Sequence, residues 1–404
     1  MNFKKTLLAL ALVLADSTAA ASNNDPIVLV HGFAGWDRDE LWGLYPHWGG
    51  TTDLQEELKK NGHDTVTAAV GPFSSTWDRA AELYYQLKGG CVDYGAAHAA
   101  QHGHARIGRC YNGNQPYVDA KRLPQWDTSH KIHLIAHSQG APTVNMLVEL
   151  LRNGSVAERA ASGSTVGELY LGGKDWVRSI TTVAGANNGT TFGKLTGFNE
   201  FAKQLLKAVG AIAGLGGNPE DLPYDFKLDQ WGLKKGSNET QQQYWDRVWA
   251  SPIWHSQDVG LYTLSPEGAA AERTWVKTSP NVYYFSYTNG TTLPGLITGN
   301  HYADPTTNLP LVPFANGMGA YRAYGDNWRQ NDGVVNTISM KAPFGAPVVE
   351  YNGNPQKGKW NHMGFSQQDH WEVIGSGDVA GNLFYNWRLV SFYVNQANLL
   401  KQLD

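Results

Sequence analysis

Residues 131–154 constrain the fold more than any other stretch of the chain. They read as a buried apolar strand, a sharp turn that carries Ser138, and a helix that ends at Gly154. This layout is typical of a nucleophile elbow, in which a strained turn lifts a serine hydroxyl above the edge of a sheet. The turn requires small residues two before and two after the serine, and Ala136 and Gly140 supply them. The alternative is a chance Ser-x-Gly in a loop, which the flanking strand and helix disfavour.

Further apolar runs of strand type alternate with helical patterns along the chain. Continuous apolar runs are typical of parallel strands that are buried on both faces. The predicted strands are residues 26–31, 65–70, 131–137, 179–184 and 282–287. The predicted helices are residues 52–60, 75–87, 142–151 and about 383–403. This alternation predicts an α/β fold with a mostly parallel central sheet and helices on both faces.

The composition of the 404 residues fits a folded protein with a large core. Hydrophobic residues make up 42% and charged residues 17%, which argues against disorder. A formal net charge of −4 without a basic stripe argues against a nucleic-acid partner. The 15 tryptophans and 19 tyrosines fill a core in the ordinary interpretation, and a fraction of them is available to line an apolar substrate cleft.

The first 21 residues have the pattern of a secretory signal peptide. Two lysines precede a short apolar run, and residues 19–21, all alanine, offer a cleavage site. The run is too short to span a bilayer, and no later segment is long and apolar enough to do so. We therefore expect an exported, soluble mature chain that begins near Ser22. In that oxidising setting Cys91 and Cys110 are expected to form a disulfide, with two free buried thiols as the alternative.

Two long insertions interrupt the alternation within one predicted domain, residues 22–404. Residues 71–128 are rich in His, Gly and Tyr, and residues 187–280 contain an amphipathic helix at 198–217 that ends among glycines. Such a helix is usually packed against the core. Beside a site in an α/β fold, its glycine hinges also make it a candidate lid.

A serine nucleophile needs a base, an acid that orients the base, and donors for the developing oxyanion. In this fold the chain order is serine, acid, histidine. Asp332 lies in a turn next to a short strand, and His370 lies in a late loop before the last helix. The pattern favours His370 over His362 only weakly, because both are in late loops.

The oxyanion donors are expected to be two backbone amides. One belongs to Gln139, directly after the nucleophile. The other belongs to Phe33, which follows His31 and Gly32 at the end of the first predicted strand. The glycine lets the chain turn there and exposes the next amide.

With these motifs in place, the chain resembles the secreted zinc-containing lipases of thermophilic bacilli and their staphylococcal relatives, within the α/β-hydrolase superfamily. The likeness covers nearly the whole mature chain. It rests on Pro26-Ile-Val-Leu-Val-His-Gly-Phe33, Val70-Gly-Pro-Phe-Ser-Ser-Thr-Trp-Asp-Arg79, Ala136-His-Ser-Gln-Gly140, Tyr224-Asp-Phe-Lys-Leu-Asp-Gln-Trp-Gly-Leu233, Asn331-Asp-Gly-Val-Val-Asn-Thr337 and Asp369-His-Trp-Glu-Val-Ile-Gly375, with residues 92–106 and 298–302.

The resemblance implies a triad of Ser138, Asp332 and His370 and the oxyanion donors Phe33 and Gln139. It also implies that the helix at 198–217 is an interfacial lid. Two features depart from the family. Residues 141–142, Ala-Pro, follow the elbow where Gly-Gln is usual, and the two cysteines are this chain's own.

A structural zinc ion is a further implication of the resemblance. Asp78, His98, His104 and Asp229 match the zinc ligands of the family. Two imidazoles and two carboxylates complete a four-coordinate shell, so the ion is expected to be structural rather than hydrolytic. Asp229 is distant from the others in sequence, so zinc is expected to pin the two insertions together. From the residues alone, His98 and His102, one helical turn apart, read as ordinary polar residues.

The family also carries a calcium site near the loop of the catalytic histidine. Glu372 matches one ligand, and Asp378 is the best remaining carboxylate because the spacing shifts by one residue. The loop near Thr306 is expected to supply a carbonyl, and oxygen-only ligation suits Ca²⁺. A solvated acidic loop is the alternative.

Together these expectations describe a secreted lipase that hydrolyses long-chain acylglycerols at an oil–water interface through an acyl-enzyme. A carboxylesterase, a phospholipase or a polyester hydrolase on the same scaffold is the alternative. Two rivals differ in kind. One is a zinc hydrolase that uses the Asp/His cluster for chemistry, and the other is a non-enzymatic lipid- or sugar-binding protein suggested by the aromatic residues. The sequence leaves the oligomeric state open.

Overall fold

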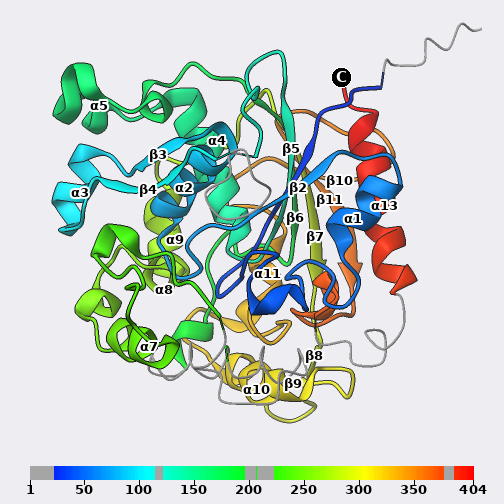
Figure 1. The fold of residues 1–404 in the computed structure, drawn as a ribbon. Coiled ribbons are helices and arrows are strands. Elements are labelled where there is room, and N and C mark those ends of the chain that lie inside the picture. Colours follow the sequence, from blue (N-terminus) through cyan, green and yellow to red (C-terminus); the bar gives the residue numbers. More distant parts are fainter. Residues whose placement is uncertain (1–21, 114–121, 196–205, 207–222, 377–385) are drawn as a thin grey trace, which may run out of the picture.

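The fold is built around a seven-stranded sheet in which every pairing is parallel (Figure 1). The structure is a computed structural model that describes residues 22–113, 122–195, 206, 223–376 and 386–404. The strand order is β10-β11-β7-β6-β5-β1-β2. The strands are β1 (Ile27–Val30), β2 (Thr65–Ala68), β5 (Ile132–His137), β6 (Val177–Val183), β7 (Tyr283–Asn289), β10 (Val348–Glu350) and β11 (Trp360–Ser366).

Both faces of the sheet are covered, because alternate residues of each strand point to opposite sides. In β1, Val28 and Val30 join one core cluster, and Ile27 and Leu29 join another. The first cluster includes residues of α2 (Thr76–Lys88) and α4 (Gly140–Asn153), and the second includes residues of α1 (Leu54–Lys60) and α13 (Trp387–Lys401). Figure 1 shows these two pairs of helices on either side of the strands. The predicted α/β fold is confirmed.

Helix boundaries follow the side chains that cap them. The Asp53 side chain accepts from the backbone amide of Glu56, and the Ser75 side chain accepts from that of Asp78. These caps satisfy amides that have no partner within the helix. The second cap fixes Asp78 in the first turn of α2, which bears on the metal cluster described below.

All five predicted strands form, and the sheet extends beyond them through two more. β11 contains Asn361 and His362 in place of an apolar run, and the buried Asn361 side chain donates to the backbone carbonyl of Tyr284. β10 is a three-residue strand at the edge, with Val348 and Glu350 exposed. Neither strand has the continuous apolar pattern from which the other five are predicted.

The first insertion, residues 71–128, carries a small antiparallel sheet. Its strands are β3 (Gly90–Asp93) and β4 (Ile107–Tyr111), with α3 (Ala96–His102) between them. Cys91 and Cys110 face each other across this sheet and form the expected disulfide.

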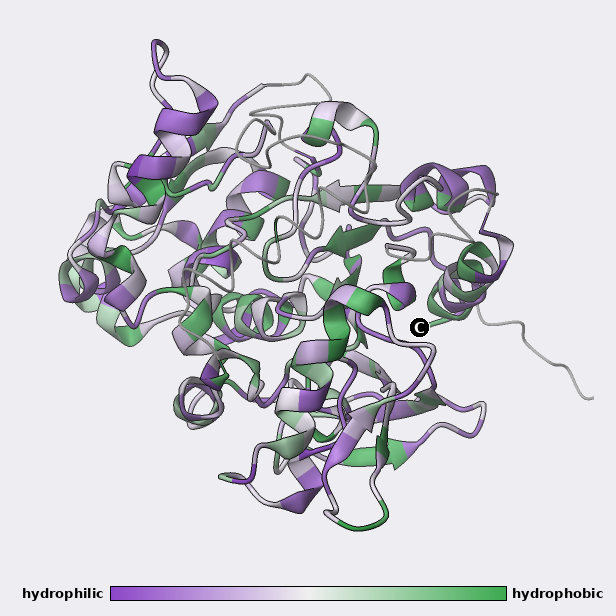
Figure 2. Ribbon diagram, turned by 90° about the horizontal axis from the view of Figure 1, so that it is seen from below, coloured by the Kyte–Doolittle hydropathy of each residue, from purple (hydrophilic) through white to green (hydrophobic). Residues whose placement is uncertain are grey.

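The remaining elements lie outside the central sheet. A second hairpin, β8 (Thr292–Pro294) and β9 (His301–Ala303), lies against α10 (Val312–Ala320) at the bottom of Figure 1. Among the described residues, the other α-helices are α5 (Val156–Ser162), α7 (Gln241–Trp249), α8 (Gly260–Thr263), α9 (Pro266–Arg273) and α11 (Thr337–Met340). In Figure 2 the outer helices mix hydrophilic and hydrophobic turns, as expected for helices with one face on a core.

Several expectations fall on residues that the structure does not describe. These are the signal peptide at 1–21, the amphipathic helix at 198–217 except the buried Leu206, and Asp378. Within the described ranges, no helix has both the length and the apolarity that crossing a bilayer requires.

Candidate active site and metal cluster

Ser138 lies at the turn between β5 and α4, where the sequence predicts an elbow. Its φ is 56°, in the left-handed region that a residue with a side chain rarely adopts. A Cβ on Gly140 would lie 2.5 Å from the carbonyl oxygen of Val30 and 3.3 Å from the Ala136 Cβ. Helix α4 therefore approaches strand β1 too closely for any side chain at position 140. With glycine there, the methyl group of Ala136 still fits against the helix.

His370 and Asp332 form a buried pair. The His370 Nδ1 lies 2.7 Å from Asp332 Oδ2, and the aspartate is fully buried. The other carboxylate oxygen accepts from the backbone amides of Val334 and Val335 at 3.0 and 2.7 Å. Asn289, at the end of β7, donates to Oδ2 at 3.0 Å. The carboxylate is thus fixed with one oxygen facing the imidazole.

His370 and Ser138 line the same small cavity, so the structure brings the three predicted triad residues to one place. His362, the weaker candidate, lies elsewhere. It belongs to β11 and contacts Glu350 through Nδ1 and Thr288 through Nε2.

Two further buried histidines lie beside this pair: the ring of His137 is 4.4 Å from that of His370, and the ring of His47 is 6.0 Å from that of His137. His137 Nε2 lies 3.0 Å from the backbone carbonyl oxygen of His370, which can only accept. Burial holds the pKa of His137 well below its usual range, and burial lowers the pKa of His47 to about 3. His137 is therefore neutral with its proton on Nε2, and it ties the loop of His370 to the elbow. Sequence reasoning gave it no role.

The loop after β1 reaches the nucleophile. A Cβ on Gly32 would lie 2.6 Å from the Ser138 Cβ, so only glycine fits there. Phe33, the next residue, lines the cavity beside Ser138, and its ring packs edge-on against Phe73 at 4.9 Å. On the other side of Ser138, Gln139 is fixed by its side-chain amide, which donates to the Ser74 carbonyl at 3.0 Å. The two expected oxyanion residues thus flank the serine.

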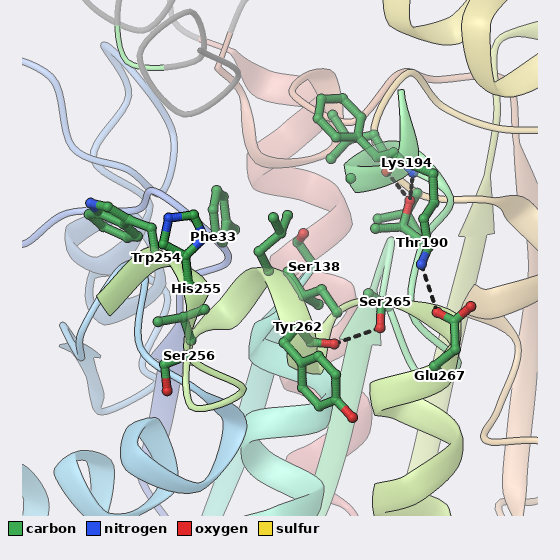
Figure 3. Close-up of a pocket in the computed structure, with 18 residues that line it drawn as sticks. Phe33, Ser138, Thr190, Lys194, Trp254, His255, Ser256, Tyr262, Ser265 and Glu267 are labelled. Carbon is green, nitrogen blue, oxygen red and sulfur yellow. Dashed lines mark hydrogen bonds and ion pairs between the residues drawn. The ribbon is translucent and has the colours of Figure 1, made fainter. Parts of the chain in front are cut away.

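A cavity of about 510 Å³ opens beside Ser138. Figure 3 shows Phe33 and Trp254 on one side of the serine and Thr190 and Lys194 on the other. Much of its lining is apolar, from Phe33, Ala186, Phe192, Trp254, Val259, Leu261, Leu264, Val334 and Val335. Lys194 and Glu267 form an ion pair at 3.0 Å in its wall. The cavity suits an acyl chain next to a polar reaction centre.

A second cluster brings together Asp78, His98, His104 and Asp258. One ligand atom from each lies within 4.8 Å of all the others. His98 Nε2 lies 3.1 Å from oxygens of both Asp78 and Asp258, and both aspartates are buried. Two carboxylates buried together require a cation or protons, and two imidazoles with two carboxylates are a donor set for zinc. The cluster could hold a metal ion.

The prediction that Asp229 is the fourth member of this cluster is wrong. Its carboxylate pairs with Arg109 Nη2 at 2.7 Å and is not part of the cluster. Asp258 takes its place from the same insertion, so the cluster still joins the two insertions. No spacing rule in the sequence singles out Asp258, because the chain between it and the histidines is long.

Two of the three residues expected at a calcium site line one cavity. Thr306 and Glu372 both border a cavity of about 570 Å³. Glu372 accepts from the backbone amide of Asp369 at 2.9 Å, and Thr306 donates its hydroxyl to Asp304 at 2.5 Å. Asp378, the third, is not described, so the described residues give only part of the expected set.

Comparison with known proteins gives the family. The family model described as "Lipase-like, C-terminal domain" matches residues 23–403, nearly the whole chain. The chain belongs to this lipase family. A lipase of Staphylococcus epidermidis is 40% identical over 362 residues, 86% of this chain and 50% of the relative. Lipase 1 of Staphylococcus aureus is 37% identical over 379 residues, 90% of this chain and 54% of the relative. The chain thus spans about half the length of these curated relatives.

Three solved structures share the fold over almost their full length. EstA from Clostridium botulinum superposes with a TM-score of 0.87 at 40% identity, over 96% of this chain and 90% of that one. Lipase 1 from Pelosinus fermentans superposes with a TM-score of 0.81 at 42% identity, over 95% of this chain and 100% of that one. Staphylococcus hyicus lipase superposes with a TM-score of 0.77 at 33% identity, over 95% of this chain and 97% of that one. The resemblance inferred from the sequence is confirmed at the level of the family.

Proposed function

We propose that this protein is a carboxylic-ester hydrolase, a lipase that acts on long-chain acylglycerols. The observation that carries the proposal is Ser138, held at positive φ at the carboxyl end of β5, in one cavity with the buried His370–Asp332 pair. Membership in the lipase family supports it, and so does the apolar cavity beside the serine.

In the proposed reaction Ser138 Oγ attacks the acyl carbonyl while His370 Nε2 takes the hydroxyl proton. Asp332 holds the imidazole with its Nδ1 proton facing the carboxylate and stabilises the imidazolium that forms. The backbone amides of Phe33 and Gln139 bind the oxyanion. The imidazolium then protonates the departing alcohol. A water molecule, deprotonated by His370, cleaves the acyl-enzyme and restores the serine.

We propose a zinc ion for the Asp/His cluster. Asp78, His98, His104 and Asp258 would hold it, and it would act as a structural cross-link between the two insertions. A calcium ion bound by Glu372, Asp378 and the Thr306 loop is proposed beside the His370 loop. In this proposal neither ion takes part in the ester chemistry, because Ser138 and His370 supply the nucleophile and the base.

Export is part of the proposal. The pattern of residues 1–21 supports it, and so does the Cys91–Cys110 disulfide, because such bonds persist in oxidising compartments. Amino-terminal sequencing of protein from the culture medium tests it, with a new terminus near Ser22 as the expected result.

The experiment compares wild type with Ser138→Ala on two substrates, an emulsified long-chain triacylglycerol and a short soluble p-nitrophenyl ester. We expect wild type to prefer the emulsion and the variant to lose hydrolysis of both, with an unchanged melting temperature. A fluorophosphonate should add once to wild type, at Ser138. A preference for the soluble ester would make the protein a carboxylesterase instead, and absence of labelling would contradict the serine mechanism.

A further inference from the structure

Arg79 is a fully buried arginine that bonds three separate segments near Ser138. It belongs to the first turn of α2, directly after Asp78. Its Nη2 donates to the His31 carbonyl at 2.5 Å, its Nη1 to the Gly71 carbonyl at 2.8 Å, and its Nε to Thr143 Oγ1 at 2.9 Å. The three nitrogens of one rigid guanidinium thus fix the mutual distances of three acceptors.

Two of these acceptors belong to the segments that carry the proposed oxyanion donors. The His31 carbonyl lies in the peptide just before Gly32 and Phe33. Thr143 Oγ1 in turn donates to the carbonyl of Gln139 at 2.9 Å. A chain of two hydrogen bonds from Arg79 therefore reaches Gln139, and one hydrogen bond reaches the loop of Phe33.

The third acceptor, the Gly71 carbonyl, adjoins a residue that bonds the far side of the same loop. Pro72, the neighbour of Gly71, accepts from the backbone amide of Ala34 at 2.9 Å. Phe33 therefore lies between two positions, the His31 carbonyl and the Ala34 amide, that are both tied to Arg79 or to the segment it binds. A shift of the guanidinium would move the loop against the elbow.

We propose that Arg79 is a positioning residue that sets the separation of the Phe33 and Gln139 amides. The inference rests on the proposed function, because it matters only if those amides bind an oxyanion. Oxyanion donors act only within a few tenths of an ångström of the productive geometry. Arg79 itself does not line the cavity beside Ser138, so its effect is transmitted through the backbone.

A lysine at position 79 replaces this arrangement poorly. Its ammonium is a single point on a flexible stem and does not reach three acceptors in different directions, whereas a guanidinium does. The charge is kept, however, so Arg79→Lys separates the loss of geometry from the loss of charge. Arg79→Gln removes both.

The test measures kcat and KM on a short soluble p-nitrophenyl ester, and the rate of fluorophosphonate labelling of Ser138, for Arg79→Lys, Arg79→Gln and Thr143→Val. For Arg79→Gln we expect kcat and the labelling rate to fall together by about 10- to 100-fold, with KM within about twofold of wild type. The loss should not exceed that caused by removing one oxyanion donor entirely. Arg79→Lys should recover part of the loss. Thr143→Val should lose several-fold, and Thr143→Ser, which keeps the hydroxyl, should match wild type.

The matched control is Leu87→Ala, also a buried residue of α2 but two turns further along, in the core cluster under the sheet. It should lower the melting temperature while keeping kcat and the labelling rate per folded molecule. If the Arg79 variants behave as this control does, Arg79 is merely structural and the inference is wrong. If Arg79→Gln does not fold, Arg79→Lys and Thr143→Val decide the question by the same criterion. Wild type that is neither labelled nor active would instead overturn the proposed function, and this inference with it.

Discussion

At the scale of single residues, the Asp332 carboxylate is satisfied on every side by donors. Two backbone amides bind one oxygen, and Asn289 and His370 bind the other. In Asp332→Asn the amide oxygen would face the two backbone amides, so the NH₂ group would point at Asn289 and His370. The imidazole then has to present Nδ1 as an acceptor, which places its proton on Nε2, where Ser138 needs a base.

We therefore expect Asp332→Asn to lower kcat by about 10⁴-fold, with a modest loss of stability. Ester hydrolysis and a thermal melt measure the two effects. The control is Asp326→Asn, an exposed aspartate that pairs with Arg329 and should retain wild-type kcat. Equal activity of the Asp332→Asn variant and wild type would contradict the proposed triad.

Sequence reasoning located the residues that follow strands and missed those that meet only in three dimensions. Ser138 directly follows a predicted strand, and Phe33 follows another after one glycine, so the fold pattern points to both. The pattern favours His370 over His362 only weakly, and the family resemblance is what implies His370. Asp258, Arg79 and His137 act on partners brought close by packing. Nothing in their sequence neighbourhood distinguishes them, and family likeness misled the prediction toward Asp229.

At the scale of elements, the five strands with continuous apolar runs were predictable because both of their faces are buried. The two others were not, for different reasons. β11 contains a polar residue, Asn361, whose side chain donates to the Tyr284 carbonyl of β7, a bond that only the assembled sheet provides. β10 is exposed at the edge and needs no apolar pattern. Tertiary context determines strands of this kind.

Strand β5 carries a buried histidine, His133, that makes the fold sensitive to acid. Burial, together with the charge of Arg178, lowers the pKa of His133 to about 3 from an unfolded value of 6.5. Below pH 6.5 the unfolded chain takes up a proton at this site and the folded protein does not, until the pH nears 3. Stability contributed by neutral His133 is therefore present above pH 6.5 and is lost as the pH falls toward 3.

Urea unfolding between pH 7 and 4 tests this effect. For each proton that the chain takes up on unfolding, the free energy of unfolding falls by at most about 1.4 kcal/mol per unit decrease in pH. In His133→Gln the free energy of unfolding should depend less steeply on pH, by the contribution of roughly one proton, although the variant is less stable at pH 7. An unchanged slope in His133→Gln would refute the effect.

The β3–β4 hairpin carries both histidines of the metal cluster on the loop that its disulfide closes. His98 and His104 lie between Cys91 and Cys110, which are 19 positions apart. Replacing both cysteines by serine should cost about 3 kcal/mol of stability, the entropy of a loop of this size. Thermal melts measure it, and the control is a reducing agent, which should destabilise wild type and leave the serine variant unchanged. A stable double variant would mean that the Arg106–Asp93 pair suffices to hold the hairpin.

At the scale of the whole molecule, the Asp/His cluster joins segments that are far apart in the chain. We expect a chelator to lower the melting temperature more than it lowers the turnover of molecules that remain folded, and added Zn²⁺ to restore it. Turnover lost in step with the metal, at a temperature where the fold persists, would favour the zinc-hydrolase alternative.

Two aspartates make a matched pair for this question. Asp258→Asn should purify with little bound zinc and a lower melting temperature, since Asp258 belongs to the cluster. Asp229→Asn should keep the zinc, because its partner is Arg109. Elemental analysis of the purified proteins measures the metal. Zinc lost from the Asp229→Asn protein and retained by the Asp258→Asn protein would contradict the assignment.

Because every strand of the sheet runs the same way, Ser138, Phe33 and His370 follow their strands at a single rim, and the opposite rim carries none of them. Lys131, just before β5, belongs to that second rim. A solid support coupled through Lys131 would hold the protein by the rim opposite Ser138 and leave the cavity beside Ser138 open to solution.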